Sequence, residues 1–304
     1  MKIVSVDKVY LYSEHLKNLK KFGQVIVYNN VPSKNEGIKR IKDADIIIDN
    51  WFKMPANVIA SAPKLKMISV AATGYEWIDM KEIKKRKIVV CNCPGYSTEA
   101  VAEHTIGLLL NSARLSSQSQ QDIKSGQWNP ATYKGKELFG KTLGIIGYGK
   151  IGKRVAEICQ KGLEMKIIFI NSKSSKKDLE KLLETSDFIS VNAPINNQTK
   201  DLLGKKEFAL MKQGIVIINT GRGAVINEQA LIENLKSGKV FAAGLDVFPN
   251  EPLENKNYPL FSFPNVITTS HIGFHTQEAE YRLSQMATEN IIKYLEGKPQ
   301  NAVS

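Results

Sequence analysis

The stretch Thr142-Leu-Gly-Ile-Ile-Gly-Tyr-Gly-Lys-Ile-Gly152 predicts the step from a buried strand into a helix. Residues 143–146 form a short apolar run that is typical of a strand inside a parallel sheet. Residues 153–161 follow, with Val155 and Ile158 spaced for one apolar face of a helix. A glycine-rich turn therefore joins a predicted strand to a predicted helix.

Each glycine of this turn has a physical role. Gly147 would permit the tight turn, Gly149 would let a pyrophosphate approach the backbone, and Gly152 would let the helix pack closely against the strand. The helix N-terminus would offer N–H groups and a partial positive charge to phosphates. Because a second apolar run follows at residues 166–170, we favour dinucleotide binding over a plain strand–turn–helix.

The composition is that of an ordinary globular protein. With 304 residues, 42% of them hydrophobic and 24% charged, the chain can form two domains with a core each. The N-terminus lacks a signal-peptide apolar region, and no apolar run reaches the length of a membrane span, so we expect a cytoplasmic protein without a membrane partner. Three cysteines suit a reducing compartment, and we interpret Cys91 and Cys93 as strand thiols rather than metal ligands, which predicts no metal.

The net charge of +12 raises the question of nucleic-acid binding. The lysines are scattered, however, and the short runs at residues 84–87 and 173–177 have no interleaved aromatic residues. A basic solvated surface is the better interpretation, and we expect no nucleic-acid partner.

Two blocks of alternating strand and helix patterns predict parallel α/β units. The strands expected in the first block are residues 3–6, 24–28, 46–49, 67–70 and 88–90, with helical segments such as 13–21 and 33–42. The second block, from about 140 to 270, begins at the glycine turn, and its further strands are expected at 166–170, 188–192, 215–219, 242–246 and 266–268, with helices at 178–184 and 227–237. Residues 276–296 predict a final helix that returns to the first unit.

Residues 97–125 predict one long helix between the two blocks. Ser97 or Thr98 can cap its start, and Gly126 would end it. A helix of this length at the boundary predicts a connector and a surface for dimer formation.

Three polar clusters follow consecutive strands of the second block. They contain Arg222 after the strand at 215–219, Glu251 after the strand at 242–246, and His271 after the strand at 266–268. Ligands of open α/β sheets bind beyond the carboxyl ends of the strands, so these side chains can converge on one point.

The chain resembles the D-isomer-specific 2-hydroxyacid dehydrogenases over nearly its whole length. The matching motifs are Gly147-Tyr-Gly-Lys-Ile-Gly152, Asn219-Thr-Gly-Arg-Gly-Ala224, Gly244-Leu-Asp-Val-Phe248 leading to Glu251-Pro252, and Ser270-His-Ile-Gly273. The resemblance implies two Rossmann-like, doubly wound parallel-sheet α/β domains with the active site in the cleft between them. Residues 1–97 and 277–304 would form a flavodoxin-like substrate-binding domain, and residues 98–276 the NAD(P)-binding Rossmann domain.

The resemblance also implies that Arg222, Glu251 and His271 are catalytic. The chemistry suits them: reduction of a 2-keto acid needs a hydride on carbon and a proton on oxygen, and an imidazole can deliver the proton. Glu251 would orient the ring of His271 and favour its protonated form, while Arg222 would bind the carboxylate and polarise the carbonyl. A purely structural role is the alternative for each of the three residues.

The substrate is expected at these residues and at one turn of the first block. The resemblance implies that Ala72, Thr73 and Gly74 present backbone N–H groups to the substrate carboxylate, together with Arg222 and His271. An ordinary turn is the alternative.

Cofactor choice depends on the end of the second strand of the Rossmann block. An acidic residue there would bind the ribose hydroxyls of NAD, whereas this chain has Asn171-Ser-Lys173 followed by further serines and lysines. We therefore predict NADP in preference to NAD. The residues predicted to contact the cofactor are Gly147, Tyr148, Gly149, Lys150, Ile151, Gly152, Asn171, Ser172, Lys173, Ala193, Pro194, Thr199, Thr220, Gly221, Asp246, Gly273 and Thr105.

Within the family, residues 70–75, 93–98 and 101–105 are most similar to glycerate dehydrogenases, also called hydroxypyruvate reductases, with glyoxylate as a related small substrate. We expect no additional C-terminal regulatory domain of the kind that some phosphoglycerate dehydrogenases have. A D-lactate or phosphoglycerate type of dehydrogenase, and a dinucleotide-sensing corepressor without catalysis, remain alternatives. We also expect a homodimer, in which Trp128 either reaches the neighbouring active site or simply packs.

The remaining histidines have no catalytic context. His15 and His275 are predicted to be surface or packing residues. His104, inside the predicted long helix, is expected to pack or to form a local hydrogen bond.

Overall fold

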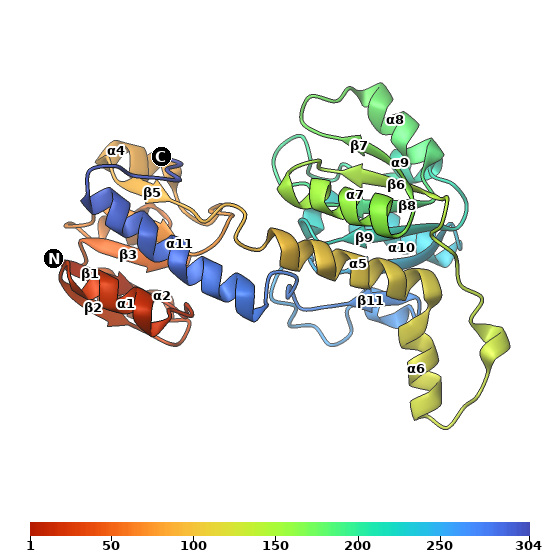
Figure 1. The fold of residues 1–304 in the computed structure, drawn as a ribbon, viewed down its shortest axis with the longest axis horizontal. Coiled ribbons are helices and arrows are strands. Elements are labelled where there is room, and N and C mark those ends of the chain that lie inside the picture. The colour runs from red at the N-terminus through yellow and green to blue at the C-terminus, as the bar shows by residue number, and fades with distance from the viewer. The chain divides into compact units, whose positions relative to one another are not determined.

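The computed structural model describes all 304 residues, which form two compact units. Unit 1 comprises Met1–Ser97 and His275–Ser304, and unit 2 comprises Thr98–Phe274 (Figure 1). Each unit contains one parallel sheet, so the prediction of two parallel-sheet α/β domains is confirmed. None of the helices combines the length and the apolar character of a membrane span.

Unit 1 contains a five-stranded sheet in the order β2-β1-β3-β4-β5. This order is that of flavodoxin-like folds, in which the chain moves outward from β1 to β2 and then crosses to β3 on the other side of β1. The strands are β1 (Lys2–Ser5), β2 (Gln24–Val27), β3 (Ile46–Asp49), β4 (Met67–Val70) and β5 (Val89–Cys91), close to the predicted ranges. Strands β3 and β4 are buried along their full length, which explains their unbroken apolar runs.

Helices cover both faces of the unit 1 sheet. They are α1 (Ser13–Lys20), α2 (Lys34–Ile41), α3 (Ala56–Ala60), α4 (Met80–Arg86) and the C-terminal α11 (Gln277–Leu295). Ile41, Val58 and Ile83 bring α2, α3 and α4 into one hydrophobic cluster with the strands. Helix α11 lies against α1 and β4, where the hydroxyl of Ser69 donates a hydrogen bond to the carbonyl of Ala287 at 2.8 Å.

Unit 2 contains a six-stranded sheet in the order β11-β10-β9-β8-β6-β7. Its strands are β6 (Thr142–Ile146), β7 (Lys166–Ile170), β8 (Phe188–Val191), β9 (Ile215–Asn219), β10 (Val240–Leu245) and β11 (Val266–Thr268). The chain moves outward from β6 to β7 and then crosses to β8 on the other side of β6. The strand order therefore reverses beside β6, and such a reversal is where open α/β sheets bind dinucleotides.

Two hydrophobic clusters cover the two faces of this sheet. On one face, α5 (Thr98–Arg114) and α7 (Lys150–Gly162) pack on β6, β8 and β9. On the other face lie α8 (Lys176–Thr185), α9 (Lys205–Leu210) and α10 (Glu228–Lys236). Short 3-10 turns complete the unit at η1 (Pro130–Thr132), η2 (Gly223–Val225) and η3 (Pro259–Ser262).

The single long helix predicted over residues 97–125 is wrong. The structure has two helices, α5 and α6 (Ser116–Lys124), separated by Leu115 in the left-handed region with a φ of 53°. The side chain of Asn111 supports the break: its amide oxygen accepts a hydrogen bond from the N–H of Ser117 at 2.9 Å. A side chain that competes with the helical ladder is a physical reason for a helix to end and restart.

Candidate active site

The glycine turn between β6 and α7 has the geometry that its residues require. Gly147 has a φ of 98°, and a Cβ there would lie 2.6 Å from the backbone nitrogen of Ala193. A Cβ at Gly152 would lie 2.2 Å from the carbonyl oxygen of Gly147, so the helix and the strand end are in close contact. A Cβ at Gly149 would meet no atom within 4 Å. The space next to Gly149 is thus open, as binding of a pyrophosphate requires.

An aromatic pair lies beside this turn. The ring of Tyr148 stacks on Phe169 of β7 with 3.7 Å between centroids and an interplanar angle of 10°, and Lys153 lies 5.9 Å from the Tyr148 ring. Lys150 and Ile151, also predicted to contact the cofactor, start α7. Sequence reasoning missed Phe169, because its 43% exposure on the strand and its contact with Tyr148 are visible only in the structure.

The loops after β8 and β9 meet the same turn. A Cβ at Gly221 would lie 2.8 Å from the carbonyl oxygen of Ala193, so these two predicted cofactor residues are neighbours. The hydroxyl of Thr220 lies 2.8 Å from that of Thr105, which is fully buried on α5. Thr105 therefore contacts Thr220 from the buried side of α5 and is not exposed at the carboxyl edge of the sheet. Further along the first loop, the hydroxyl of Thr199 donates to the carbonyl of Pro194 at 2.6 Å.

The turn after β7 contains no carboxylate at the strand end. The side-chain oxygen of Asn171 accepts from the N–H of Lys173 at 2.8 Å, which holds the turn, and Ser172 and Lys173 are exposed. The first acidic residue beyond the strand, Asp178, accepts from the N–H of Ser175 at 2.7 Å as part of the cap of α8. The carboxylate of Asp178 is consequently engaged in capping the N-terminus of α8.

Arg222, Glu251 and His271 follow β9, β10 and β11, which are adjacent strands of the sheet. Nδ1 of His271 lies 2.6 Å from Oε2 of Glu251, and the other carboxylate oxygen accepts from the N–H of Phe248 at 2.7 Å. Arg222 donates to the carbonyl of Gly221 at 2.9 Å, and Asn219 donates to the carbonyl of Arg222 at 3.1 Å. The structure thus brings the Glu251–His271 pair into direct contact at the carboxyl edge.

The environment of Glu251 keeps it ionised. Partial burial raises the pKa of this carboxyl, but the hydrogen bonds from His271 and Phe248 and the charges of His271 and Arg222 outweigh that effect and lower it. Because Nδ1 of His271 is engaged with Glu251, Nε2 is the ring nitrogen that can exchange a proton with a bound molecule. The pair can therefore act as an oriented acid and base.

The predicted carboxylate-binding turn lies in unit 1, directly after β4. The carbonyl of Ala72 accepts from the N–H of Cys93 at 2.9 Å, and the carbonyl of Thr73 accepts from the side chain of Asn92 at 2.7 Å. The hydroxyl of Thr73 donates to the carbonyl of Cys93 at 3.0 Å. These bonds engage the carbonyls of Ala72 and Thr73, and the turn continues to Gly74.

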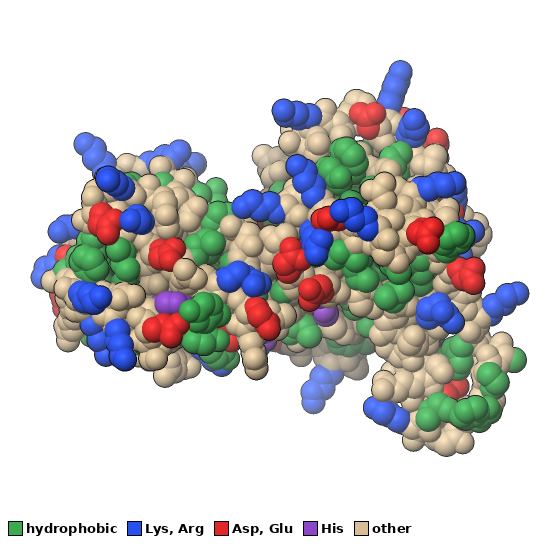
Figure 2. Space-filling model, viewed as in Figure 1, with side chains coloured by type: hydrophobic (Ala, Val, Ile, Leu, Met, Phe, Trp, Pro, Cys, Tyr) green, Lys and Arg blue, Asp and Glu red, His purple; other side chains and the backbone are tan.

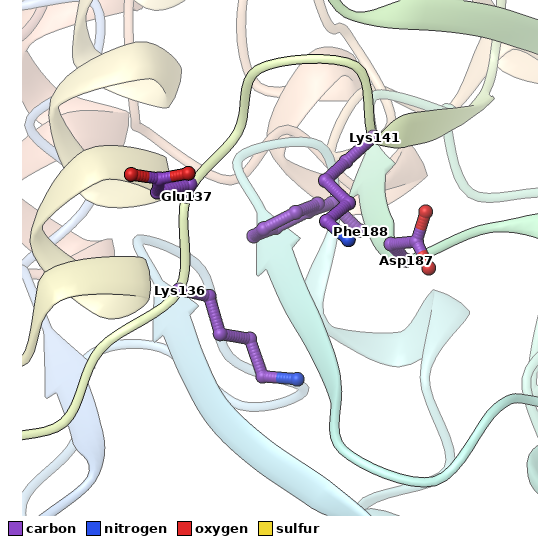
Figure 3. A pocket seen from close by; sticks show the side chains of 5 residues that line it. All are labelled: Lys136, Glu137, Lys141, Asp187 and Phe188. Carbon is purple, nitrogen blue, oxygen red and sulfur yellow. The ribbon is translucent and has the colours of Figure 1, made fainter.

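A hollow of about 320 Å³ in unit 2 lies away from these residues. Lys136, Glu137, Lys141, Asp187 and Phe188 line it (Figure 3). Lys141 and Asp187 directly precede β6 and β8, so the hollow is at the amino ends of the strands, whereas ligands of such sheets bind at the carboxyl ends. It is not the candidate active site.

Several other predictions concern single residues. No group of three or more His, Cys, Asp or Glu side chains could hold a metal ion. Cys91 and Cys93 are buried, and burial raises the pKa of the Cys91 thiol to about 11. His15 is buried against Ser284, with 2.7 Å between Nδ1 and Oγ, and His275 lies 2.6 Å from Glu280.

The prediction for His104 is wrong in one respect. Its hydrogen bond is not local: Nε2 lies 3.1 Å from the hydroxyl of Thr269, a residue far along the chain, and 3.3 Å from Asp246. Asp246 and Gly273, both predicted to contact the cofactor, belong to the same cluster, because the N–H of Gly273 donates to the Asp246 carboxylate at 2.9 Å.

Comparisons with known proteins agree with this geometry. Residues 106–273 match the family model of the D-isomer specific 2-hydroxyacid dehydrogenase NAD binding domain. The chain is 37% identical over 310 residues to a D-3-phosphoglycerate dehydrogenase of Methanocaldococcus jannaschii, covering 98% of this chain but only 58% of that relative.

Two further proteins match along their full length. A hydroxypyruvate reductase of Blautia hydrogenotrophica is 37% identical over 323 residues and is covered completely, as is this chain. The solved structure of an acyclic imino acid reductase in complex with NADPH and D-Arg has a TM-score of 0.91 and 34% identity, with both chains fully covered. The chain therefore belongs to the D-isomer specific 2-hydroxyacid dehydrogenase family.

Proposed function

We propose that this chain reduces a small 2-keto acid, hydroxypyruvate or glyoxylate, to the D-2-hydroxy acid with NADPH or NADH. The observation that carries the proposal is the 2.6 Å contact between Nδ1 of His271 and Glu251, with Arg222 on the adjacent strand end and the glycine turn in the same sheet. The hydroxypyruvate reductase from Blautia hydrogenotrophica, matched along its whole length, supports the choice of substrate.

The proposed roles follow from the chemistry of the side chains. A bound nicotinamide cofactor supplies the hydride. His271 delivers the proton to the substrate oxygen through Nε2, and Glu251 holds the ring in that orientation. Arg222 binds the carboxylate through its planar guanidinium and polarises the carbonyl. The turn at Ala72–Gly74 contributes backbone N–H groups to the same carboxylate.

We propose NADPH as the preferred cofactor. The turn after β7 offers the exposed side chains of Ser172 and Lys173, and it lacks a free carboxylate for the ribose hydroxyls because Asp178 caps α8. The open space at Gly149 fits a pyrophosphate, and the stacked Tyr148 and Phe169 provide a flat apolar surface nearby.

We also propose that a second copy of the chain covers the segment from α6 to Phe139. This segment exposes Ile123, Trp128 and Phe139, whose relative exposures are 51%, 80% and 67%, and hydrophobic side chains gather there in Figure 2. Exposed apolar residues in such a group mark protein–protein contacts. Elsewhere on the face shown, basic and acidic side chains are interspersed, which argues against a basic stripe for nucleic acid (Figure 2).

The test is the loss of NADPH or NADH absorbance with a panel of acceptors. We expect turnover with hydroxypyruvate or glyoxylate, and a loss of at least about 10²-fold in kcat for His271→Ala, since general acid catalysis contributes about 10²- to 10⁴-fold. Arg222→Ala should lower kcat/KM, whereas His275→Ala, on an exposed histidine of unit 1, serves as the matched control and should leave both constants unchanged.

The other arms of the panel separate the alternatives. Preference for pyruvate would indicate a D-lactate type, and preference for 3-phosphohydroxypyruvate a phosphoglycerate type. Turnover only with a keto acid plus ammonium would indicate reduction of an imino acid, the chemistry named for the similar solved structure. Tight cofactor binding without turnover of any acceptor would contradict the catalytic proposal and favour the corepressor-like role.

A further inference from the structure

His104 reaches the carboxyl edge of the unit 2 sheet from α5. Its Nε2 lies 3.1 Å from the hydroxyl oxygen of Thr269 and 3.3 Å from Oδ1 of Asp246. The hydroxyl of Thr269 in turn donates a short hydrogen bond to the same oxygen of Asp246. His104, Thr269 and Asp246 therefore form a continuous polar chain between α5 and the ends of β10 and β11.

Asp246 connects this chain to the segment 269–273, which contains His271. Asp246 is 2% exposed, and its carboxylate accepts from the N–H groups of Ile272 and Gly273, both at 2.9 Å. Its backbone carbonyl accepts from the N–H of His271, also at 2.9 Å. Asp246 thus fixes the backbone of His271, Ile272 and Gly273.

The backbone of His271 needs such support. Its φ of 56° is in the left-handed region, which costs a residue with a side chain about 1 kcal/mol or more. A conformation of this kind persists only where the surroundings determine it. Here the conformation is held by the hydrogen bonds that Asp246 accepts from the N–H groups of His271, Ile272 and Gly273.

Packing gives a second, independent reason for His104. A Cβ at Gly273 would lie 2.9 Å from Oδ2 of Asp246 and 3.3 Å from Cδ2 of His104. The imidazole therefore fills the space directly against the Gly273 backbone. Loss of the ring would leave this part of the segment without its neighbour.

The electrostatics of Asp246 act in the same direction. Burial raises the pKa of this carboxyl, but the hydrogen bonds from His104, Thr269, Gly273 and Ile272 outweigh it and lower the pKa. His104 is the titratable side chain from α5 that contacts the Asp246 carboxylate, whereas His271 contacts Asp246 through its backbone N–H. Loss of His104 therefore removes one of the hydrogen bonds that lower the pKa of Asp246, so this pKa rises.

We propose that His104 is a positioning residue for the reaction, which holds Thr269 and Asp246 and through them sets the position of His271. The inference rests on the proposed reduction of a 2-keto acid. It does not assign His104 a contact with substrate or cofactor. It predicts that His104 acts on kcat, because the residues proposed to bind the substrate carboxylate lie outside its polar chain.

The experiment compares His104→Leu, His104→Gln and Thr269→Val with the wild type. His104→Leu removes the donor, and we expect kcat to fall by about 10- to 100-fold with KM for the keto acid nearly unchanged, as for a small misplacement of a reacting group. Glutamine can place its amide nitrogen close to the position of Nε2, so His104→Gln should restore most of kcat. Glu103→Gln, on the neighbouring exposed position of α5, is the matched control.

Two readouts separate positioning from general loss of structure. The acid limb of the pH–rate profile should move to higher pH in His104→Leu, because a higher pKa of Asp246 lets this carboxyl protonate sooner as the pH falls. Thr269→Val, which keeps the shape but breaks the polar chain, should reproduce the loss of kcat, and the double variant should lose less than the product of the two single losses.

Amide hydrogen exchange of a peptide spanning residues 269–273 tests the inference without turnover. We expect faster exchange in His104→Leu and near wild-type exchange in His104→Gln. If the wild type reduces no acceptor, the proposed function fails, and exchange still decides whether His104 holds the segment. Wild-type kcat, pH profile and exchange in both His104→Leu and Thr269→Val would overturn the inference.

Discussion

Two alanine substitutions in one turn separate cofactor binding from folding. At Gly152, a Cβ would lie 2.2 Å from the carbonyl oxygen of Gly147, about 1.2 Å inside ordinary van der Waals contact, and the obstacle is backbone. At Gly149, a Cβ would meet nothing within 4 Å, and the φ of −85° is open to alanine. Gly152→Ala should therefore destabilise unit 2, while Gly149→Ala should not.

The magnitudes follow from these contacts. Overpacking of this kind costs about 1–3 kcal/mol. In a unit of the size of Thr98–Phe274, this corresponds to a decrease in Tm of about 2–12 °C for Gly152→Ala. For Gly149→Ala, the added methyl group occupies the space where phosphates would approach, so the Kd of NADPH should rise at least about tenfold, or about 1.4 kcal/mol.

Thermal unfolding of the protein without ligand and calorimetric titration with NADPH and NADH measure the two effects. Gly162→Ala is the matched control, since a Cβ at this last residue of α7 also meets nothing within 4 Å. It should leave both Tm and Kd near the wild-type values. Wild-type Kd in Gly149→Ala would refute the placement of the phosphates at this turn, and an unchanged Tm in Gly152→Ala would refute the packing argument.

Three further predictions concern cofactor choice, association and pH. Asn171→Asp places a carboxylate at the end of β7, and the ratio of kcat/KM for NADH to kcat/KM for NADPH should rise about tenfold or more. Lys236→Ala, at an exposed position, is the control and should leave this ratio unchanged. An unchanged ratio in Asn171→Asp would contradict the assignment of the ribose site to this turn. Trp128→Ala should weaken the dimer in light scattering, and if it also leaves KM and kcat unchanged, Trp128 has no part in a neighbouring active site. Burial, and to a smaller extent the charge of nearby Asp7, raises the pKa of fully buried Asp49. The Asp49 carboxyl therefore stays protonated in the folded state, whereas it ionises above about pH 4 in the unfolded state. The free energy of unfolding consequently falls as the pH rises toward the pKa of Asp49 in the folded state. Denaturation of the wild type at pH 5 and pH 8, followed by tryptophan fluorescence, should show this decrease, and Asp49→Asn should show a smaller one. Equal differences would exclude Asp49 as the source.

The sequence by itself determined most of the elements that are local in origin. The apolar runs of β3, β4 and β9 coincide with the observed strands, because a strand buried on both faces must be apolar throughout. The apolar runs of the edge strands β7 and β11 also coincide with the observed ranges. The glycine turn could be recognised because the spacing of its three glycines, between an apolar run and a helical pattern, is local in the sequence. The positions of Arg222, Glu251 and His271 after successive strands also indicated that the three would lie at one edge of the sheet.

Tertiary structure alone decided the contacts between residues that are distant in sequence. The stack of Tyr148 on Phe169 needs the pairing of β6 with β7, and the bond between His104 and Thr269 needs α5 to pack across the sheet. The break at Leu115 depends on one left-handed residue and on the side chain of Asn111, which no apolar periodicity records. Local patterns report which face of an element is buried, whereas side-chain hydrogen bonds depend on which elements meet. The support of His271 by Asp246 and His104 became visible only in the folded chain for this reason.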